Sequence, residues 1–332
     1  MKRYVLIFLI SFPILAFSQV NSQFDSSVYI EKMNNTLNIK VELDNDAESF
    51  LYTEGLNRYT IEPNINTRIG ISTNYRFLSI KVGFTPKALS NINSDRKGET
   101  KMFKIQSDIF VNNWIQSFDY LKVKGYYLKD FNPILGLMPR LKDYEILPEL
   151  KTLSIGGTTA YKFNNHFSLK SILTQNEIQL KSTGSTISSL NYGYFKMYDK
   201  TQGLDLRSFD LVINTGFIYT HVINEKLFAS LSGIPGIGIE FNKLVTNFED
   251  EMIITKDNNF VFHLNAQLGL GYNTKRFYAG THIKGIVTAR GKKSLVGFNT
   301  LRGVFQIYVG YRFKAPKFVE NAFDWMEDQN PL

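Results

Sequence analysis

The stretch from 260 to 272 reads FVFHLNAQLGLGY, and apolar residues alternate in it with polar or small ones. Phe262, Leu264 and Leu268 fall on one face of an extended chain, while Asn265 and Gln267 fall on the other. A repeat of two residues is typical of a β-strand and does not fit the 3.6-residue repeat of a helix. The stretch therefore predicts a strand that is longer than most and apolar on one face only.

The same alternation recurs over most of the chain. It is clear near both ends, from 36 to 44 (TLNIKVELD) and from 305 to 313 (FQIYVGYRF). Counting such stretches gives thirteen candidate strands, near residues 36–44, 58–74, 77–85, 101–111, 117–128, 152–163, 167–176, 185–197, 208–221, 226–242, 259–272, 276–289 and 301–313. The chain is therefore predicted to be all-β.

Two all-β architectures fit this pattern, a secreted soluble β-protein and a membrane barrel. The predicted strands run about 9 to 14 residues, which is enough to cross a bilayer when tilted. Aromatic residues such as Tyr75, Tyr272 and Phe313 stand at strand ends. Short polar turns alternate with longer loops near 87–100, 129–150, 243–258 and 291–299. We therefore expect an antiparallel transmembrane β-barrel with a polar lumen in the cell outer membrane, and the soluble protein remains the alternative.

The number of strands needs a correction, because bacterial barrels have an even number and both termini in the periplasm. When strands are counted from the N-terminus, the short turns near Asn74 and Asn164 fall on the periplasmic side. When they are counted from the C-terminus, the short turns near Asn224 and Asn273 fall on that side. The two counts disagree on strand direction only between 167 and 207. The error in the strand count, here called the phase error, is therefore placed around 176–197. We expect about twelve strands, with ten and fourteen as neighbours, and one segment outside the wall.

Composition narrows the class of protein. The 332 residues include 38 Lys and Arg against 30 Asp and Glu, 43% apolar residues and no Cys. These values exclude a disordered chain, a coiled coil and a helical membrane protein. The charges are scattered, so nucleic acid is not an expected partner. Without Cys there is no disulfide, thiolate nucleophile or Cys-ligated zinc.

The N-terminus predicts secretion. Lys2 and Arg3 precede an apolar run from Tyr4 to Leu15, which is followed by small residues at the positions that a signal peptidase reads. The predicted organisation is a signal peptide over 1–18, a periplasmic segment over 19–35, the barrel over 36–313 and a periplasmic tail over 314–332.

A series of short motifs runs through the mature chain in a fixed order. They are FDS (24–26) with Tyr29-Ile30, EPN (62–64) with Gly70, GETK (98–101), KGYY (124–127), YKFN (161–164) with Phe167-Ser168, QNEIQLKSTGS (175–185), GYN (271–273) and YRF (311–313). In these motifs almost the whole mature chain resembles domain of unknown function 4421, an uncharacterised Bacteroidetes outer-membrane family. The resemblance implies an outer-membrane β-barrel of unassigned function.

Motifs for catalysis or cofactor binding are not found. The sequence has no G-x-S-x-G, H-E-x-x-H, P-loop or EF-hand pattern. His263 and His282 share the predicted inner face of adjacent strands, where a metal pair is conceivable and a hydrogen-bond network is favoured. Ser171 is the one candidate lipase nucleophile and lacks a clear His partner. We expect no enzyme, cofactor, catalytic residue or metal, and an outer-membrane lipid enzyme remains a remote alternative.

Two loops carry clustered charge. Glu249, Asp250, Glu251 and Asp257 offer oxygen ligands to Ca²⁺, although a solvated acidic loop is favoured. The Lys292-Lys293 pair offers a contact for lipopolysaccharide phosphates or is simply exposed. The expected partners are outer-membrane lipid, lipopolysaccharide and, during insertion, the barrel-assembly machinery, and the oligomeric state stays open.

Two functions fit a barrel of this size, since twelve strands lie between small filled barrels and open porins. The favoured one is a narrow channel or specific porin for small polar solutes. The alternative is a filled structural or interaction barrel, accessory to secretion, attachment or envelope assembly. The predicted lumen-lining residues are Arg68, Lys81, Lys104, His263, Gln267, His282, Lys284 and Arg312.

The stretch from 175 to 185 is too polar for lipid contact and adjoins the phase error. We expect it to leave the wall and form a constriction, since irregular backbone at membrane depth must be buried in protein or line water. The candidate constriction residues are Gln175, Glu177, Gln179, Lys181, Ser182 and Ser185. An ordinary strand pair with a hairpin at Thr183-Gly184 is the equal alternative.

Overall fold

The computed structural model describes residues 28–46, 48–54, 57–65, 67–86, 94–130, 144–224, 226–248, 251–291 and 299–329. The predicted signal peptide and the Lys292-Lys293 pair lie outside these residues. No helix in the described part of the chain is long and apolar enough to span a membrane.

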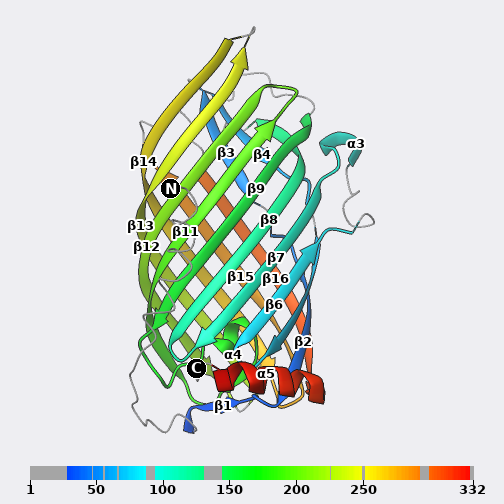
Figure 1. Cartoon of the computed structure of the whole chain (residues 1–332), viewed down its shortest axis with the longest axis vertical. Coiled ribbons are helices and arrows are strands. Elements are labelled where there is room, and N and C mark those ends of the chain that lie inside the picture. The colour runs from blue at the N-terminus through cyan, green and yellow to red at the C-terminus, as the bar shows by residue number, and fades with distance from the viewer. Residues whose placement is uncertain are drawn as a thin grey trace.

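Twelve antiparallel strands close into one barrel, as predicted (Figure 1). Two of them are interrupted, so that each consists of two pieces. In chain order the wall is formed by β2 (Thr36–Asp44) with β3 (Ser49–Glu54), β4 (Asn57–Glu62) with β5 (Arg68–Tyr75), β6 (Leu78–Phe84), β7 (Lys101–Val111), β8 (Trp114–Asp130), β9 (Glu145–Lys162), β11 (Thr183–Asp199), β12 (Leu204–Val222), β13 (Leu227–Phe248), β14 (Glu251–Asn273), β15 (Phe277–Arg290) and β16 (Asn299–Lys314). The last strand, β16, pairs with β2 and closes the wall, with Val309 opposite Val41.

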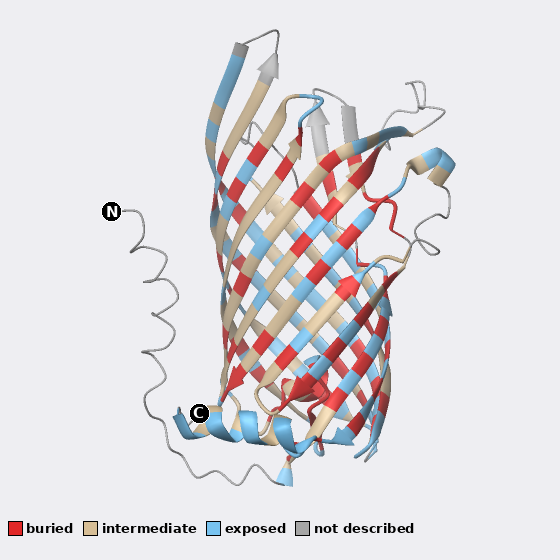
Figure 2. Cartoon of the chain, turned by 45° about the vertical axis from the view of Figure 1, so that its right-hand side comes forward, coloured by how far each residue is buried: buried red, intermediate tan, exposed pale blue. Residues whose placement is uncertain are grey.

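The two faces of the wall are inverted relative to a soluble protein. Large apolar side chains point outward, and Phe260, Ile237 and Leu268 are 77%, 66% and 46% exposed. Polar side chains point inward, and Asn38 and Arg68 are 0% and 1% exposed. Figure 2 shows this alternation of exposed and buried residues along the strands. An apolar exterior on a closed barrel is stable in lipid and not in water, which favours the membrane barrel over the soluble protein.

The two ends of the barrel differ. The chain enters at β2 and leaves at β16 at one end, where the turns at 76–77, 112–113 and 274–276 are short. We call this the plugged end and the opposite one the loop end. Aromatic rings surround the plugged end, where Trp114 and Phe163 both pack on Tyr161 with ring centres 4.9 and 5.0 Å away. A girdle of aromatic residues around one end of a barrel is typical of a membrane interface.

One of the thirteen predicted strands, 167–176, is wrong, because these residues do not form a strand of the wall. Residues 163–182, here called the plug segment, leave the wall after β9 and fold inside the plugged end. The segment forms one short helix, α4 (Lys170–Leu173), and a short strand, β10 (Glu177–Gln179), which pairs with β1 (Ile30–Lys32). The phase error therefore lies before 183, earlier than predicted, and 183–199 is a wall strand.

Two further predictions need correction. Thr183-Gly184 is not a hairpin turn, because both residues lie in β11 opposite Thr220 and Tyr219 of β12. The predicted loop over 243–258 is largely strand, since β13 and β14 continue as a paired hairpin to Phe248 and Glu251. A helix also follows the barrel. It is α5 (Lys317–Gln329), and it lies across the plugged end in Figure 1.

Candidate functional site

The plug segment is held inside the barrel first by apolar contact. Phe167 is fully buried, and Leu169 and Ile172 are 6% and 4% exposed. They pack in one cluster with inward side chains of the wall, which are Phe110, Ile115, Ala160 and Ile187. Burying side chains of this size stabilises a fold by roughly 1.5–3 kcal/mol each. The segment is therefore a packed part of the barrel interior.

Local hydrogen bonds shape the segment. The Ser168 hydroxyl accepts a bond from the Ser171 amide at 3.0 Å and donates one to Glu177 at 2.5 Å, which joins α4 to β10. Gln175 reverses the chain with a positive φ of 54°. The Gln179 amide group also donates to the carbonyl oxygens of Tyr29 and His166. The polar residues in this stretch thus serve its own turns and their contacts with the N-terminal segment.

Side chains of the wall also bind the backbone carbonyls of the plug segment. Asn38 Nδ2 and Asn74 Nδ2 both donate to the Thr174 carbonyl, at 2.8 and 3.2 Å. Further donors are Lys40 Nζ to Leu173, Asn273 Nδ2 to Glu177, and Arg312 Nε to Gln175, at 3.1, 3.3 and 3.0 Å. These five inward side chains, from β2, β5, β14 and β16, are called the carbonyl latch.

Charges at the plugged end are partly desolvated. Burial lowers the pKa of Lys170, and Glu177, whose carboxylate oxygen lies 3.8 Å from Lys170 Nζ, acts in the opposite direction. Outside the plug, Asp324 and Glu327 of α5 both lie 2.7 Å from Arg76 in the β5–β6 turn. Phe323 of α5 packs edge-on against Tyr75 at 4.8 Å. The helix after the barrel is thus attached to the same end as the plug segment.

Above the plug segment the inward charges are cross-linked. Arg68 Nη2 lies 3.0 Å from Asp46 and 2.8 Å from Asp44, and Lys104 Nζ lies 3.2 Å from Asp46. Arg302 also forms an ion pair with Asp46. A second group joins Lys40 and Lys81 to Glu42, and a third joins Arg290 to Glu240 at 2.7 Å. A buried charge is tolerated when it has such partners.

At mid-height several inward side chains, among them Asp119, Asp210, His263 and Lys284, are only half-buried. His263 lies 2.8 Å from Asn214, and His282 lies 3.1 Å from Gln267. Among the described residues, Asp119, Asp210 and Lys284 have no ion pair within 4.0 Å. Water therefore reaches this level of the lumen, between more tightly packed levels above and below.

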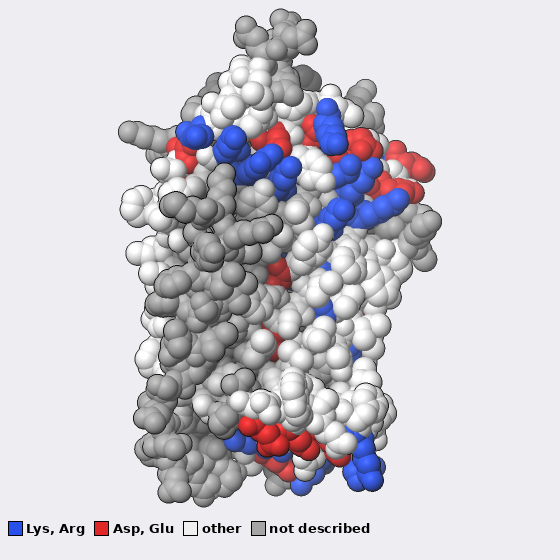
Figure 3. All heavy atoms as spheres, in the orientation of Figure 1, with Lys and Arg blue, Asp and Glu red and all other residues white. Residues whose placement is uncertain are grey.

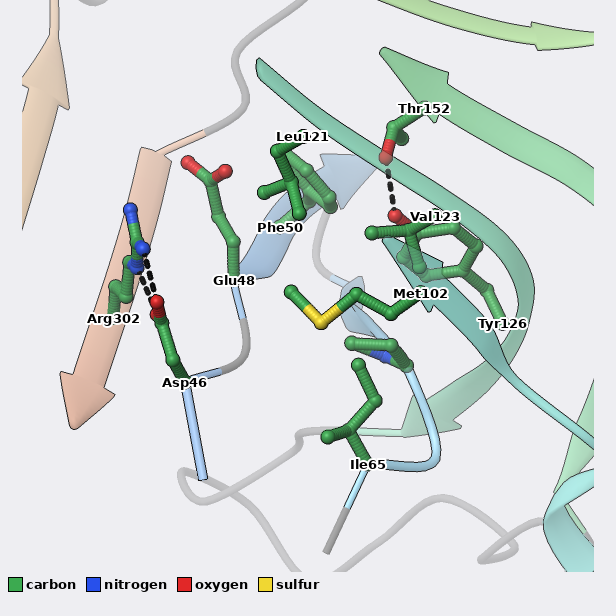
Figure 4. A pocket seen from close by; sticks show the side chains of 11 residues that line it. Asp46, Glu48, Phe50, Ile65, Met102, Leu121, Val123, Tyr126, Thr152 and Arg302 are labelled. Atoms are coloured by element: carbon green, nitrogen blue, oxygen red, sulfur yellow. Dashed lines mark hydrogen bonds and ion pairs between the residues drawn. The ribbon is translucent and has the colours of Figure 1, made fainter. Parts of the chain in front are cut away.

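Toward the loop end the inner face becomes apolar. A cluster formed by Phe50, Ile65, Met102, Leu121, Val123, Tyr126, Leu150, Met197 and Leu206 fills the lumen, and each of these side chains is at most 9% exposed. Figure 4 shows part of the cluster around a cavity of about 10 Å³, with Glu48 and the Asp46–Arg302 pair on one side. A cavity of that size holds about one water molecule. The lumen is therefore narrow at this level too.

The structure places all eight predicted lumen-lining residues on the inner face of the wall. Arg68 and Lys104 meet at Asp46, and Gln267 and His282 bond to each other. Arg312 lies apart from them, in the carbonyl latch. His263 and His282 bond to different amides, and no group of three or more metal-ligating side chains was found in the described part of the chain.

The candidate constriction residues divide into two groups. Gln175, Glu177 and Gln179 are buried in the plug segment. Lys181 and Ser182 are exposed where that segment ends, and Ser185 lies in wall strand β11. These three residues therefore do not narrow the lumen between the plug segment and the loop end. Ser171 is buried and donates to the Ser168 carbonyl at 2.8 Å. The residues that sequence reasoning missed are Phe167 and Ile172, whose apolar pattern was assigned to a wall strand.

A barrel with this exterior belongs in a particular membrane. Closed antiparallel barrels of even strand number, with an apolar outer band flanked by aromatic rings, are the membrane proteins of the bacterial outer membrane. The closed wall of twelve strands and the exposed apolar belt meet these conditions, and aromatic residues line the belt at the plugged end. The chain is therefore an outer-membrane β-barrel.

Solved structures with some likeness to this one are outer-membrane proteins. The β domain of the Bordetella autotransporter BrkA matches at 8% identity and a TM-score of 0.38, over 84% of this chain and 100% of its own. The outer-membrane protease OmpT from Escherichia coli matches at 8% identity and a TM-score of 0.35, over 85% and 98%. At these values the likeness carries no information on activity.

Sequence comparison gives a family without a known activity. No curated protein matches the chain. The family described as "Domain of unknown function (DUF4421)" matches residues 23–313, which is nearly the whole of the barrel and the segment before it. The chain belongs to this family.

Proposed function

We propose that the protein is a closed barrel that serves as a structural or interaction component of the outer membrane, and that it is not a permanently open porin. The observation that carries this proposal is the carbonyl latch, because five inward side chains from four wall strands hold one segment across the plugged end. A segment that merely rested in a pore would not need donors aimed at its backbone. Unmade hydrogen bonds in a buried site are costly, so the latch favours the closed state.

The packing of the lumen supports the same proposal. Inward charges are paired with each other at the level of Asp46, and the apolar cluster around Phe50 and Met197 fills the loop-end half. A selective pore leaves charged side chains free to meet passing solutes. An interior that satisfies its own charges resembles the core of a small filled barrel.

A second candidate is the narrow channel for small polar solutes, opened when the plug segment leaves. The half-buried level of Asp119, Asp210 and Lys284 favours it, because these side chains are reached by water and have no ion pair in the described part of the chain. In this case the plug segment is a gate. Removing the plug segment would leave an open channel under the second candidate and a filled lumen under the first.

Conductance in planar bilayers tests both candidates. Phe163 donates its amide proton to the Thr186 carbonyl at 3.2 Å, so Asn164 and Ser185 can be joined by a two-residue turn. Replacing residues 165–184 by Asn-Gly removes the plug segment and, of the wall, only Thr183 and Gly184 at the start of β11. The control replaces residues 200–203, the β11–β12 turn at the loop end, by Asn-Gly.

We expect no stable conductance from the natural protein or the control. A conducting natural protein would overturn the proposal. Conductance confined to the variant without the plug segment would favour the gated channel. Silence of all three correctly folded proteins would support the filled barrel.

Orientation is part of the proposal, with the plugged end in the periplasm. Short turns are periplasmic in bacterial barrels, and the described chain begins before β1 and ends with α5 at the plugged end. Since the chain has no Cys, single cysteines report orientation cleanly. In intact cells a membrane-impermeant maleimide should label Gln202→Cys, at the loop end, and should not label Asp328→Cys in α5. The reverse labelling would invert the topology.

A further inference from the structure

A band of outward-facing cations crosses the loop-end half of the wall. Lys101 of β7 stands directly opposite Lys124 of β8, which in turn stands opposite Lys151 of β9. These three residues form a row across three neighbouring strands. Like charges directly opposite each other destabilise a sheet, because their β-carbons lie only about 5 Å apart. An anion beside the row therefore offsets its repulsion.

A second row continues the band over the next strands. Lys196 of β11 stands opposite Arg207 of β12, Arg207 opposite Lys243 of β13, and Lys243 opposite Lys256 of β14. All four lie on the outer face, since they share the alternation of the exposed residues Leu190, Phe209, Phe241 and Phe260 on their own strands. Four cations in direct succession are a feature of the register and cannot be read from any single strand.

The carboxylates within the band are too few to neutralise it. Glu149 lies 2.7 Å from Lys124 and 3.6 Å from Lys151. Asp205 lies 2.8 Å from Arg207 and 3.2 Å from Lys196. In the described ranges Lys243 and Lys256 have no carboxylate within 4.0 Å. Part of the band thus remains available to an external anion.

The height of the band indicates which anion that is. Phe241 and Phe209 are 43% and 41% exposed and stand two residues below Lys243 and Arg207 on the same face. Two residues along a strand span about 6.6–6.8 Å, so the cations lie one step beyond the apolar belt. Figure 3 shows Lys and Arg, with Asp and Glu among them, gathered in a band above a wide surface with few charges. This is the level of lipid headgroups.

We propose that this cation band binds the phosphates of lipid A, the phosphorylated lipid anchor of lipopolysaccharide in the outer leaflet. Phosphate oxygens accept charge-assisted hydrogen bonds from Lys and Arg, and one phosphate between two opposed cations would turn their repulsion into attraction. The choice of leaflet rests on the proposed orientation. Binding itself is measured in detergent, so it is tested independently of orientation and of conductance.

The test compares two variants of equal charge change. In the band variant, Lys196, Arg207 and Lys243 are each changed to Gln. In the control variant, Lys226, Lys275 and Lys314, which are exposed at the plugged end, are changed in the same way. The probes are bisphosphorylated lipid A, its dephosphorylated form and phosphatidylglycerol, each titrated into the folded full-length protein in zwitterionic detergent.

We expect the natural protein and the control variant to bind bisphosphorylated lipid A, and the band variant to lose affinity by about tenfold or more. Without lipid A, Lys243→Gln alone should melt at a higher temperature than the natural protein, because it removes a cation that faces Arg207 and Lys256 and breaks no ion pair in the described part of the chain. Should the band variant fail to fold, Lys243→Gln and its single control Lys226→Gln provide the same comparison with one charge each. Equal affinity of the two variants, or equal binding of phosphatidylglycerol and lipid A by the natural protein, would overturn the proposal.

Discussion

Phe167 is the residue at which the packing of the plug segment can be measured most directly. Its ring is fully buried among inward side chains that include Phe110 and Ile115. Truncating a buried Phe to Ala removes its transfer free energy and leaves a cavity, which together cost about 3–5 kcal/mol. Phe167→Ala should therefore weaken the plugged barrel by that amount.

Phe163 is the matched control, because it is the same residue type, four positions earlier, and is 58% exposed. It contacts the Tyr161 ring edge-on at 5.0 Å, and losing such a pair costs about 1 kcal/mol. Urea unfolding of both variants in lipid vesicles, followed by fluorescence of Trp114 and Trp325, gives the free energies of unfolding.

Hydrogen exchange of the amides of residues 167–180 shows whether the plug segment is released before the wall unfolds. In Phe167→Ala we expect faster exchange there, a lower free energy of unfolding, or both. If Phe167→Ala matched Phe163→Ala in both measurements, the plug segment would not be a packed part of the barrel interior.

Two further substitutions test the wall. Leu268→Arg places a charge on the outer face, where Leu268 is 46% exposed, and should cost about 2–4 kcal/mol in lipid, whereas Gln267→Arg should fold normally; equal tolerance of both in a refolding gel would argue against a membrane barrel. Gly310→Val should destabilise the barrel by about 1–3 kcal/mol, because a β-carbon there would overlap the buried Tyr278 ring, while Gly303→Val on the same strand meets nothing within 4 Å and should melt like the natural protein.

The wall was predictable because alternation directly encodes it. In 260–272 every second residue is apolar, and Leu268 is exposed to lipid while Gln267 points into the lumen. The apolar cluster near the loop end was not predicted, since Leu121 and Val123 sit on the inner face and break the rule that lumen residues are polar. A single sequence offers no sign of this exception.

The plug segment was misread for a related reason. From Phe167 to Lys170 apolar and polar residues alternate as in a strand, yet Phe167 and Leu169 pack inside the barrel. Parity and turn lengths placed the segment that leaves the wall around 175–197, whereas it spans 163–182 in the structure. The ion pairs at Asp46 were likewise out of reach, because they depend on the register of β2, β5 and β16. Register across distant strands is not encoded by alternation.

The carbonyl latch has a consequence for the order of assembly. Asn38 is supplied by the first strand, Arg312 by the last, and the segment they hold comes from the middle of the chain. The segment can be fully bound only after β16 has found β2, and a closure shifted by one residue would turn Asn38 or Arg312 toward the lipid. Docking of the plug segment thus reports correct closure. A barrel closed in a shifted register would therefore be left without a fully bound plug segment.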